Sequence, residues 1–367
     1  MGGFPALSFE DATSYWKMPE SADIVRAIVE TAREWREPDY PKREAAVEKT
    51  LKASNTFTTE AIAFAVNQQL SLLEDDELKA WAPRRLPVQA VSVGVLNAGN
   101  VPFIGLQDFL AVILSGHRYI GSVSSRSPAL LPSFAADISD RIDLAADFVD
   151  ADLLFHQVDA VIATGSNETA EWVSSRCDEA GISPERRLIR SHRFSVAVLD
   201  GRESLEELEH LAEDALLHEG FGCRNVAVIW APAGHSPDDF LDALARFRAV
   251  FPAHASTPGR LKMQQAFLEA VSAPHAHGEG LEFLLSKGDP DVQPPGHIRW
   301  SEYVNLDEVR MWLLDNKKTI QLVVTRQDMR EQLGTDLPGG VLGEAQRPAL
   351  NWRPDERDVM SFLASLA

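Results

Sequence analysis

Apolar residues recur at helical spacing in the first part of the chain. Between residues 21 and 36, Ile24, Ile28 and Trp35 fall on one side of a helical projection. The stretch 58–73 repeats this pattern. Two amphipathic helices are therefore predicted before residue 80.

After residue 87 the pattern changes to short apolar runs that alternate with helical segments. Strands are predicted at 88–96, 119–123, 159–163 and 195–199, and helices at 105–115, 128–141 and 168–179. Apolar strands that alternate with helices are typical of a doubly wound parallel sheet. The predicted fold class is therefore α/β.

A second unit is predicted to begin near Gly201. Ser204 and Glu207 have the spacing of a capping box, which marks the start of a helix. Further strands are predicted at 226–230 and 319–324, and further helices at 236–251 and 307–315. The stretch 254–296 gives only weak signals.

These patterns divide the chain into four parts. We predict a helical segment over 1–87, α/β domains over 88–200 and 201–335, and a C-terminal segment over 336–367 that returns to the core.

Composition limits the function classes. The 367 residues suffice for about two domains, and a net charge of −20 argues against a nucleic-acid or anionic-membrane surface. Two cysteines give no disulfide framework. We find no signal peptide at the amino terminus and no apolar run of roughly 18 residues, the length of a membrane span. The expected location is the cytoplasm.

One of the two cysteines, Cys223, lies at the junction of a predicted helix and a predicted strand. Its surroundings read EGFGCRNVAV. A helix terminus and the neighbouring Arg224 favour a thiolate, which is the reactive form of cysteine. The alternative is a small buried side chain near a turn.

Two predicted strands end in loops whose residues are suited to ligand binding or catalysis. Gly165 and Ser166 follow one strand, where backbone N–H groups at a helix start can bind a phosphate. Asn97 and Asn100 follow another, where an amide N–H can stabilise an oxyanion. A helix cap and an Asx turn are the structural alternatives. The pair His275 and His277 lacks a third ligand at a recognised spacing, so no metal site is predicted.

Taken in order, these motifs resemble the aldehyde dehydrogenase superfamily, and within it the LuxC-type fatty acyl-CoA reductases. The resemblance covers about residues 88–367. The matching blocks are AGNVPFIGLQDFLAVILSGH from Ala98, DAVIATGSNETA from Asp159, SVAVL from Ser195, GFGCRNVAV from Gly220 and PALNWRPDERDVMSFL from Pro348. The resemblance implies that the domain over 88–200 binds a cofactor and that the domain over 201–335 is catalytic.

The resemblance implies roles for two catalytic residues. Cys223 matches the nucleophile that takes the acyl group, and Asn100 matches the oxyanion-hole asparagine. The superfamily's hydrolytic members carry a general base near the position of Arg190, where the segment RSHRF has no carboxylate. That absence suits an enzyme that transfers acyl groups from CoA rather than to water.

The resemblance also implies a nicotinamide cofactor. Gly165 and Ser166 match the turn beside its pyrophosphate, and Ser124 and Ser125 match the segment that contacts the adenosine ribose. Ser125 stands where NAD-preferring relatives have a glutamate, which favours NADP(H) and leaves NAD(H) open.

One departure weakens that preference. The family's lysine before the paired serines is replaced here by Ser122, and Arg118 or Arg126 is the expected substitute.

The implied activity is NADPH-dependent reduction of a long-chain fatty acyl-CoA, or of an acyl-carrier thioester, to the aldehyde by a homo-oligomer. Two alternatives stay open: a nicotinamide-independent cysteine acyltransferase or thioesterase, and a non-catalytic subunit with the same fold.

Overall fold

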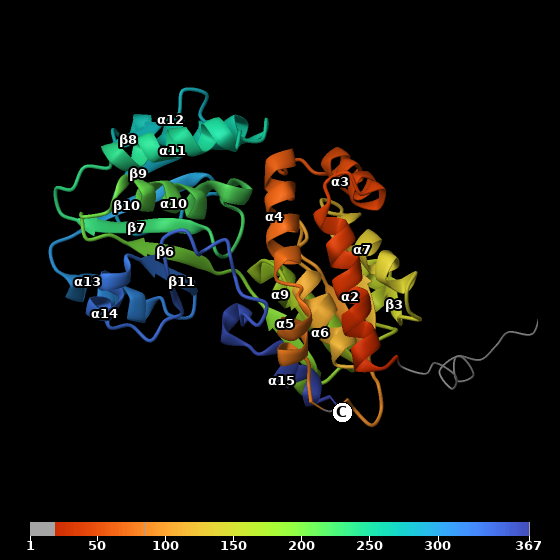
Figure 1. The fold of residues 1–367 in the computed structure, drawn as a ribbon. Coiled ribbons are helices and arrows are strands. Elements are labelled where there is room, and N and C mark those ends of the chain that lie inside the picture. The colour runs from red at the N-terminus through yellow and green to blue at the C-terminus, as the bar shows by residue number, and fades with distance from the viewer. Residues whose placement is uncertain (1–18, 85, 367) are drawn as a thin grey trace, which may run out of the picture.

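The N-terminal helices cover one face of the first α/β unit in the computed structural model, which describes residues 19–84 and 86–366 (Figure 1). The stretch examined above for a signal peptide, residues 1–18, lies outside the described residues. The helices are α2 (Ser21–Arg36), α3 (Pro41–Ala53), α4 (Thr59–Ser71) and α5 (Asp75–Trp81). The predictions at 21–36 and 58–73 are confirmed as α2 and α4.

An aromatic cluster joins these helices to the unit beneath. The Trp35 ring of α2 stacks on Phe103 at 6.2 Å and meets Phe134 edge-on at 5.2 Å. Its Nε1 donates to Asp137 at 2.8 Å. The buried indole thus has both an apolar environment and a hydrogen-bond partner, as a buried tryptophan requires.

The first unit contains a parallel sheet of five strands in the order β3-β2-β1-β4-β5. The strands are β1 (Ser92–Leu96), β2 (Arg118–Ser122), β3 (Ala146–Phe148), β4 (Ala160–Thr164) and β5 (Arg187–Arg190). The helices are α6 (Leu106–Leu114), α7 (Leu130–Ser139), α8 (Ala151–Leu154) and α9 (Asn167–Glu179). The predicted doubly wound parallel sheet is confirmed.

The second unit contains a sheet of seven strands in the order β12-β11-β6-β7-β10-β9-β8. The strands are β6 (Phe194–Val198), β7 (Val226–Pro232), β8 (His275–His277), β9 (Leu284–Lys287), β10 (His297–Tyr303), β11 (Ile320–Thr325) and β12 (Gly339–Val341). Among the strands that the structure describes, only β8 pairs antiparallel. The helices are α10 (Leu205–Leu216), α11 (Asp238–Val250), α12 (Thr257–Ala270), α13 (Leu306–Asp315) and α14 (Gln327–Leu333).

The chain passes from the first sheet to the second between β5 and β6. Strand β6 pairs with β7 and β11, so it belongs to the second sheet. The boundary predicted at residue 200 is therefore one strand too late. Strand β5 was not predicted, because its sequence RLIR has only two apolar residues between two arginines.

The C-terminal segment touches both units. It contributes β12 to the second sheet and then runs back to α15 (Val359–Ala364), which packs beside α6 of the first unit (Figure 1). The Nε2 atom of His117 lies 3.2 Å from the carbonyl oxygen of Leu363. The last helix thus closes the first unit.

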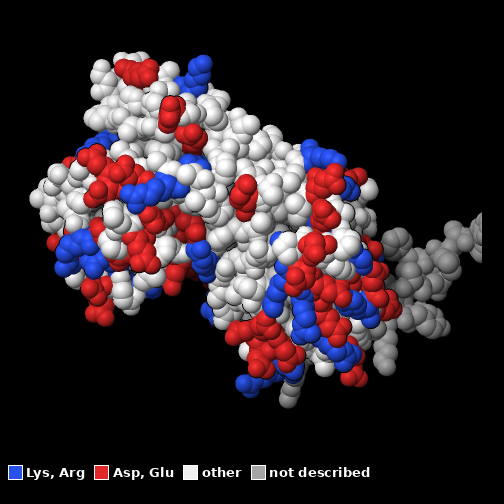
Figure 2. Space-filling model, turned by 45° about the horizontal axis from the view of Figure 1, so that its top comes forward, with Lys and Arg blue, Asp and Glu red and all other residues white. Residues whose placement is uncertain are grey.

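Negative charge is spread over the surface. On the face in Figure 2, Asp and Glu side chains lie on both units with Lys and Arg among them. The net charge of −20 is therefore not gathered in one patch on this face. No helix in the described part of the chain has the length and apolar character needed to cross a bilayer.

Candidate active site

A tightly bonded loop between α10 and β7 holds Cys223. The backbone N–H of Gly222 donates to Oδ1 of Asn225 at 2.8 Å, and the Asn225 amide donates to three carbonyls at the end of α10. Ser195 Oγ donates to the Cys223 carbonyl at 3.1 Å. The buried Asn225 thus fixes both ends of the loop.

The residues just before this loop adopt an uncommon backbone conformation. His218 and Glu219 have φ angles of 54° and 58°, in the left-handed region that side chains other than glycine rarely occupy. The buried Glu219 carboxylate pairs with Arg248 at 2.9 Å and with the Thr257 hydroxyl. Gly220 follows at φ 75°, where an added Cβ would lie 2.8 Å from the Gly296 nitrogen. Buried polar contacts therefore hold the strained turn in place.

The Cys223 thiol is not activated by its neighbours. Burial raises the pKa of Cys223 to about 11, and the nearby Arg224 opposes this only in part. Arg224 donates instead to the carbonyls of Ala345 and Glu344, and its guanidinium lies over the Trp352 ring at 4.7 Å. Burial therefore disfavours the thiolate expected beside Arg224, because desolvation of the charged sulfur outweighs the attraction of the arginine.

Asn100 reaches the cysteine loop from the other unit. Its Nδ2 donates to the carbonyl of Phe221 at 2.8 Å, and its Oδ1 is buried without a partner among the described residues. Asn97 instead ends strand β1, since its amide donates to the carbonyls of Val95 and Ser122 and to the Tyr119 hydroxyl. The two asparagines of one loop thus have different surroundings, and only Asn100 lies beside the segment that carries Cys223.

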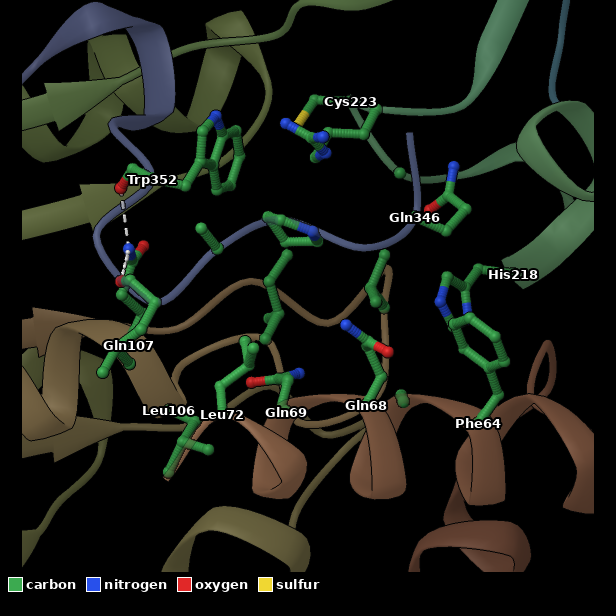
Figure 3. A pocket seen from close by; sticks show the side chains of 18 of the residues that line it. Phe64, Gln68, Gln69, Leu72, Leu106, Gln107, His218, Cys223, Gln346 and Trp352 are labelled. Carbon is green, nitrogen blue, oxygen red and sulfur yellow. Dashed lines mark hydrogen bonds between the residues drawn. The ribbon is translucent and has the colours of Figure 1, made fainter. Parts of the chain in front are cut away.

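A largely apolar pocket opens below Cys223 (Figure 3). Helix α4 forms its floor, from which Phe64, Gln68 and Leu72 point toward the space under the thiol. The space between these side chains is about 880 Å³, including the part open to solvent. The remaining apolar lining comes from Ala65, Leu73, Val101, Ile104, Leu106, Leu110, Pro348, Ala349, Leu350 and Trp352.

The C-terminal segment forms one wall of this pocket. The amide of Gln107 on α6 donates to the carbonyls of Leu350 at 2.8 Å and Trp352 at 2.7 Å (Figure 3). The buried Asp214 carboxylate accepts from the backbone N–H groups of Gly343 at 2.7 Å and Ala345 at 3.0 Å. Both units therefore anchor the wall.

The pocket face of α4 was predicted only in part. The side predicted to face inward carries Ile62, Val66, Gln69 and Leu73; Ile62 and Val66 pack into the core, and Gln69 and Leu73 line the pocket. Phe64, Gln68 and Leu72 also recur four residues apart, so a second stripe was present in the sequence. The glutamine in that stripe made it look solvent-exposed.

The predicted cofactor residues lie at one edge of the first sheet. Strand β1 lies between β2 and β4, and connections leave it in both directions, which defines a topological switch point. Ser124 follows β2, and Gly165 follows β4. Because the strands are parallel, both loops lie at the same edge. Ser166 accepts a hydrogen bond from the Thr169 N–H at 3.2 Å, so it also caps α9.

The two candidate substitutes for the missing lysine differ in position. Arg118 begins β2, at the opposite end of the strand from Ser122, and pairs with Asp147 at 2.7 Å. It therefore cannot take the lysine's place. Arg126 is exposed in the loop with Ser124 and Ser125, so it is the remaining candidate.

A buried ion pair occupies the region of the absent general base. Nη1 of Arg190 donates to both carboxylate oxygens of Asp108, at 2.7 and 3.0 Å. The Nε and Nη2 atoms of Arg190 have no partner among the described residues. The carboxylate that reaches this region from α6 is thus already bound by an arginine.

Comparisons with known proteins agree with this architecture. The family model described as acyl-CoA reductase (LuxC) matches residues 17–248, more than half of the chain. A search of curated proteins found no match.

Solved structures share the fold at low sequence identity. An oxidoreductase from Marinobacter aquaeolei has a TM-score of 0.72 and 12% identity, with 96% of this chain and 85% of that chain covered. Aldehyde dehydrogenase 21 from Physcomitrella patens has a TM-score of 0.69 and 11% identity, with 97% of this chain and 85% of that chain covered. A NAD-dependent benzaldehyde dehydrogenase from Corynebacterium glutamicum has a TM-score of 0.67 and 13% identity, with 90% of this chain and 83% of that chain covered. The fold is thus that of the aldehyde dehydrogenases, and the chain belongs to the LuxC acyl-CoA reductase family.

Proposed function

We propose that the protein reduces a long-chain fatty acyl-CoA, or an acyl-carrier thioester, to the fatty aldehyde with NADPH, through an acyl group carried on Cys223. One observation carries the proposal. A cysteine in a rigid loop lies at the top of an apolar pocket, between the two units of an aldehyde dehydrogenase fold.

The residues at the switch point fit a nicotinamide dinucleotide. The first turn of α9, a helix of 13 residues, offers backbone N–H groups for a pyrophosphate beside Gly165 and Ser166. Ser124 and Ser125 offer hydroxyls for a ribose and no carboxylate that would repel a 2′-phosphate. The exposed Arg126 lies in the same loop. Its guanidinium is suited to pair with a 2′-phosphate, which favours NADPH over NADH.

The first step is transfer of the acyl group to Cys223. The sulfur attacks the thioester carbonyl, the bond from that carbon to the CoA sulfur breaks, and the thiol proton leaves with CoA as its free thiol. Burial raises the pKa of the Cys223 thiol to about 11, which is consistent with loss of its proton during the attack.

The second step is reduction of the acyl group while it stays on Cys223. A nicotinamide cofactor held beside Gly165 and Ser166 would supply the hydride. The carbonyl carbon accepts it and becomes a thiohemiacetal alkoxide. Its collapse breaks the carbon–sulfur bond, releases the aldehyde, and leaves the Cys223 sulfur to take a proton from water.

Two chain groups stabilise the oxyanion in both steps. One N–H of the Asn100 amide donates to the Phe221 carbonyl. We propose that its second N–H and the backbone N–H of Cys223 donate to the oxyanion. Loss of one such donor typically lowers the rate by about 10²–10³-fold.

Hydrolysis of the acyl group is disfavoured by the Arg190–Asp108 pair. Both oxygens of the Asp108 carboxylate already accept hydrogen bonds from the buried Arg190 guanidinium, so the carboxylate is not free to bind and orient a water molecule. The acyl group is therefore kept for reduction.

Steady-state kinetics with C14 and C16 acyl-CoA and each nicotinamide tests the proposal. We expect aldehyde formation coupled to NADPH oxidation, lost in Cys223→Ala and retained in Cys177→Ala, whose cysteine is buried in α9. Arg126→Ala should lower kcat/KM for NADPH and leave that for NADH unchanged. Full activity of Cys223→Ala would overturn the mechanism, and thioester turnover without nicotinamide would favour a cysteine acyltransferase or thioesterase.

A further inference from the structure

We propose that the acyl chain of the substrate carries a hydroxyl group, and that His218 recognises this hydroxyl together with the glutamines of the pocket. The inference rests on the proposed function, because it concerns the substrate of the same site. The reaction at Cys223 does not use His218.

His218 brings an unsatisfied polar group to an apolar pocket. Its side chain lines the pocket and the residue is 6% exposed. The Nδ1 atom is buried and has no hydrogen-bond partner among the described residues. Buried polar atoms are nearly always hydrogen-bonded in proteins, so an orphan in a binding pocket points to a group on the ligand.

The backbone holds this ring in place at a cost. His218 and Glu219 both adopt left-handed backbone conformations, which are energetically unfavourable for residues other than glycine. The ion pair of Glu219 with Arg248 maintains these conformations. Strain of this kind persists where the surrounding structure enforces it, and it concentrates at functional sites. The ring of Phe64 meets His218 edge-on at 6.3 Å and limits its rotation.

Further polar groups gather on the same side of the pocket. Figure 3 shows Gln68 beside Phe64 on α4, with His218 and Gln346 across from them. The buried Gln346 is anchored by its amide, which donates to the Asp214 carbonyl at 3.1 Å. The lining near Leu72 and Leu106 holds more apolar side chains, together with Gln69 and with Gln107, whose amide is bound to the carbonyls of Leu350 and Trp352. A ligand that fits both sides has an alkyl part and a polar substituent.

The polar substituent is neutral rather than charged. Burial lowers the pKa of His218 to about 3, so the imidazole is uncharged at neutral pH. Gln68 and Gln346 are uncharged as well. The pocket's arginine, Arg224, is bound to two carbonyls and stacked on Trp352. Neutral imidazole and amide groups both donate and accept hydrogen bonds, which suits a hydroxyl.

Binding to the Cys223→Ala protein tests the inference without turnover. Calorimetry would compare decanoyl-CoA with decanoyl-CoAs that carry one hydroxyl at successive carbons. We expect at least one hydroxylated chain to bind about tenfold more tightly than the plain chain. His218→Phe should remove that preference, because phenylalanine keeps a ring and lacks the nitrogens. His218→Asn is the matched control, since asparagine is polar and tolerates a left-handed backbone.

Each result decides between the ideas. Plain decanoyl-CoA that binds as tightly as every hydroxylated chain would overturn the inference, and so would a preference that survives in His218→Phe. In that case an ordered water satisfies the ring. A hydroxyl preference without thioester reduction by the wild-type protein would support the inference and contradict the proposed function. Aldehyde formation without any hydroxyl preference would support the proposed function and contradict the inference.

Discussion

At the scale of single residues, burial decides the chemistry more strongly than sequence neighbours do. The sequence indicated Cys223 as the reactive residue, and the loop places it at a pocket. Its protonation state was not predictable, because it depends on desolvation by segments far away in the chain. His218 was missed for the same reason, since its position depends on a strained backbone that no local pattern reveals.

The raised pKa of Cys223 predicts slow alkylation of the unliganded protein. A thiol with a pKa of about 11 is almost fully protonated at pH 7, and the thiolate is the reactive form. We expect the rate of modification by iodoacetamide at Cys223 to keep rising with pH beyond 9, as followed by peptide mass spectrometry. A rate that levels off below pH 8 would show an activated thiolate instead.

Asp214 predicts a pH dependence of stability. Burial raises its pKa from 3.8 to about 7, so the folded state keeps a proton that the unfolded state loses near pH 4. The stabilisation is complete below pH 4 and is lost as the pH rises to about 7. Urea unfolding of the wild type and Asp214→Asn between pH 4 and 8 measures it. The variant should lack this decline, and equal slopes in both proteins would refute the assignment.

At the scale of elements, hydrophobic periodicity predicted the strongly patterned helices and strands. It located α2, α4, α6 and β1, and the capping box of α10 is present as predicted. It missed α3, which buries little apolar surface, and β10, which lies beside a region rich in Pro, Gly and His. Elements whose burial depends on distant partners carry a weak local signal.

The end of α10 should depend strongly on Asn225. This side chain donates to three carbonyls and accepts from the Gly222 N–H, all in a buried setting. Asn225→Ala leaves these groups unpaired, and we expect a loss of about 3 kcal/mol in the free energy of unfolding. Urea denaturation provides the measurement. A loss below about 0.5 kcal/mol would mean that water replaces the side chain.

At the scale of the whole molecule, the pocket is assembled from four stretches that lie far apart in sequence. Helix α4, the loop before α6, the cysteine loop and the C-terminal wall each supply part of the lining. The resemblance to a family predicted the cysteine and the fold class, which are set by ordered motifs. The wall anchored by Gln107, Asp214 and Arg224 depends on tertiary contacts, so the sequence alone did not reveal it.

The most direct test of the central claim is the intact mass of the protein after incubation with hexadecanoyl-CoA in the absence of nicotinamide. We expect a gain of one hexadecanoyl group on Cys223, absent in Cys223→Ala, present in Cys177→Ala, and released as hexadecanal when NADPH is added. An acyl group on another residue, or one released by NADPH as the free acid, would contradict it.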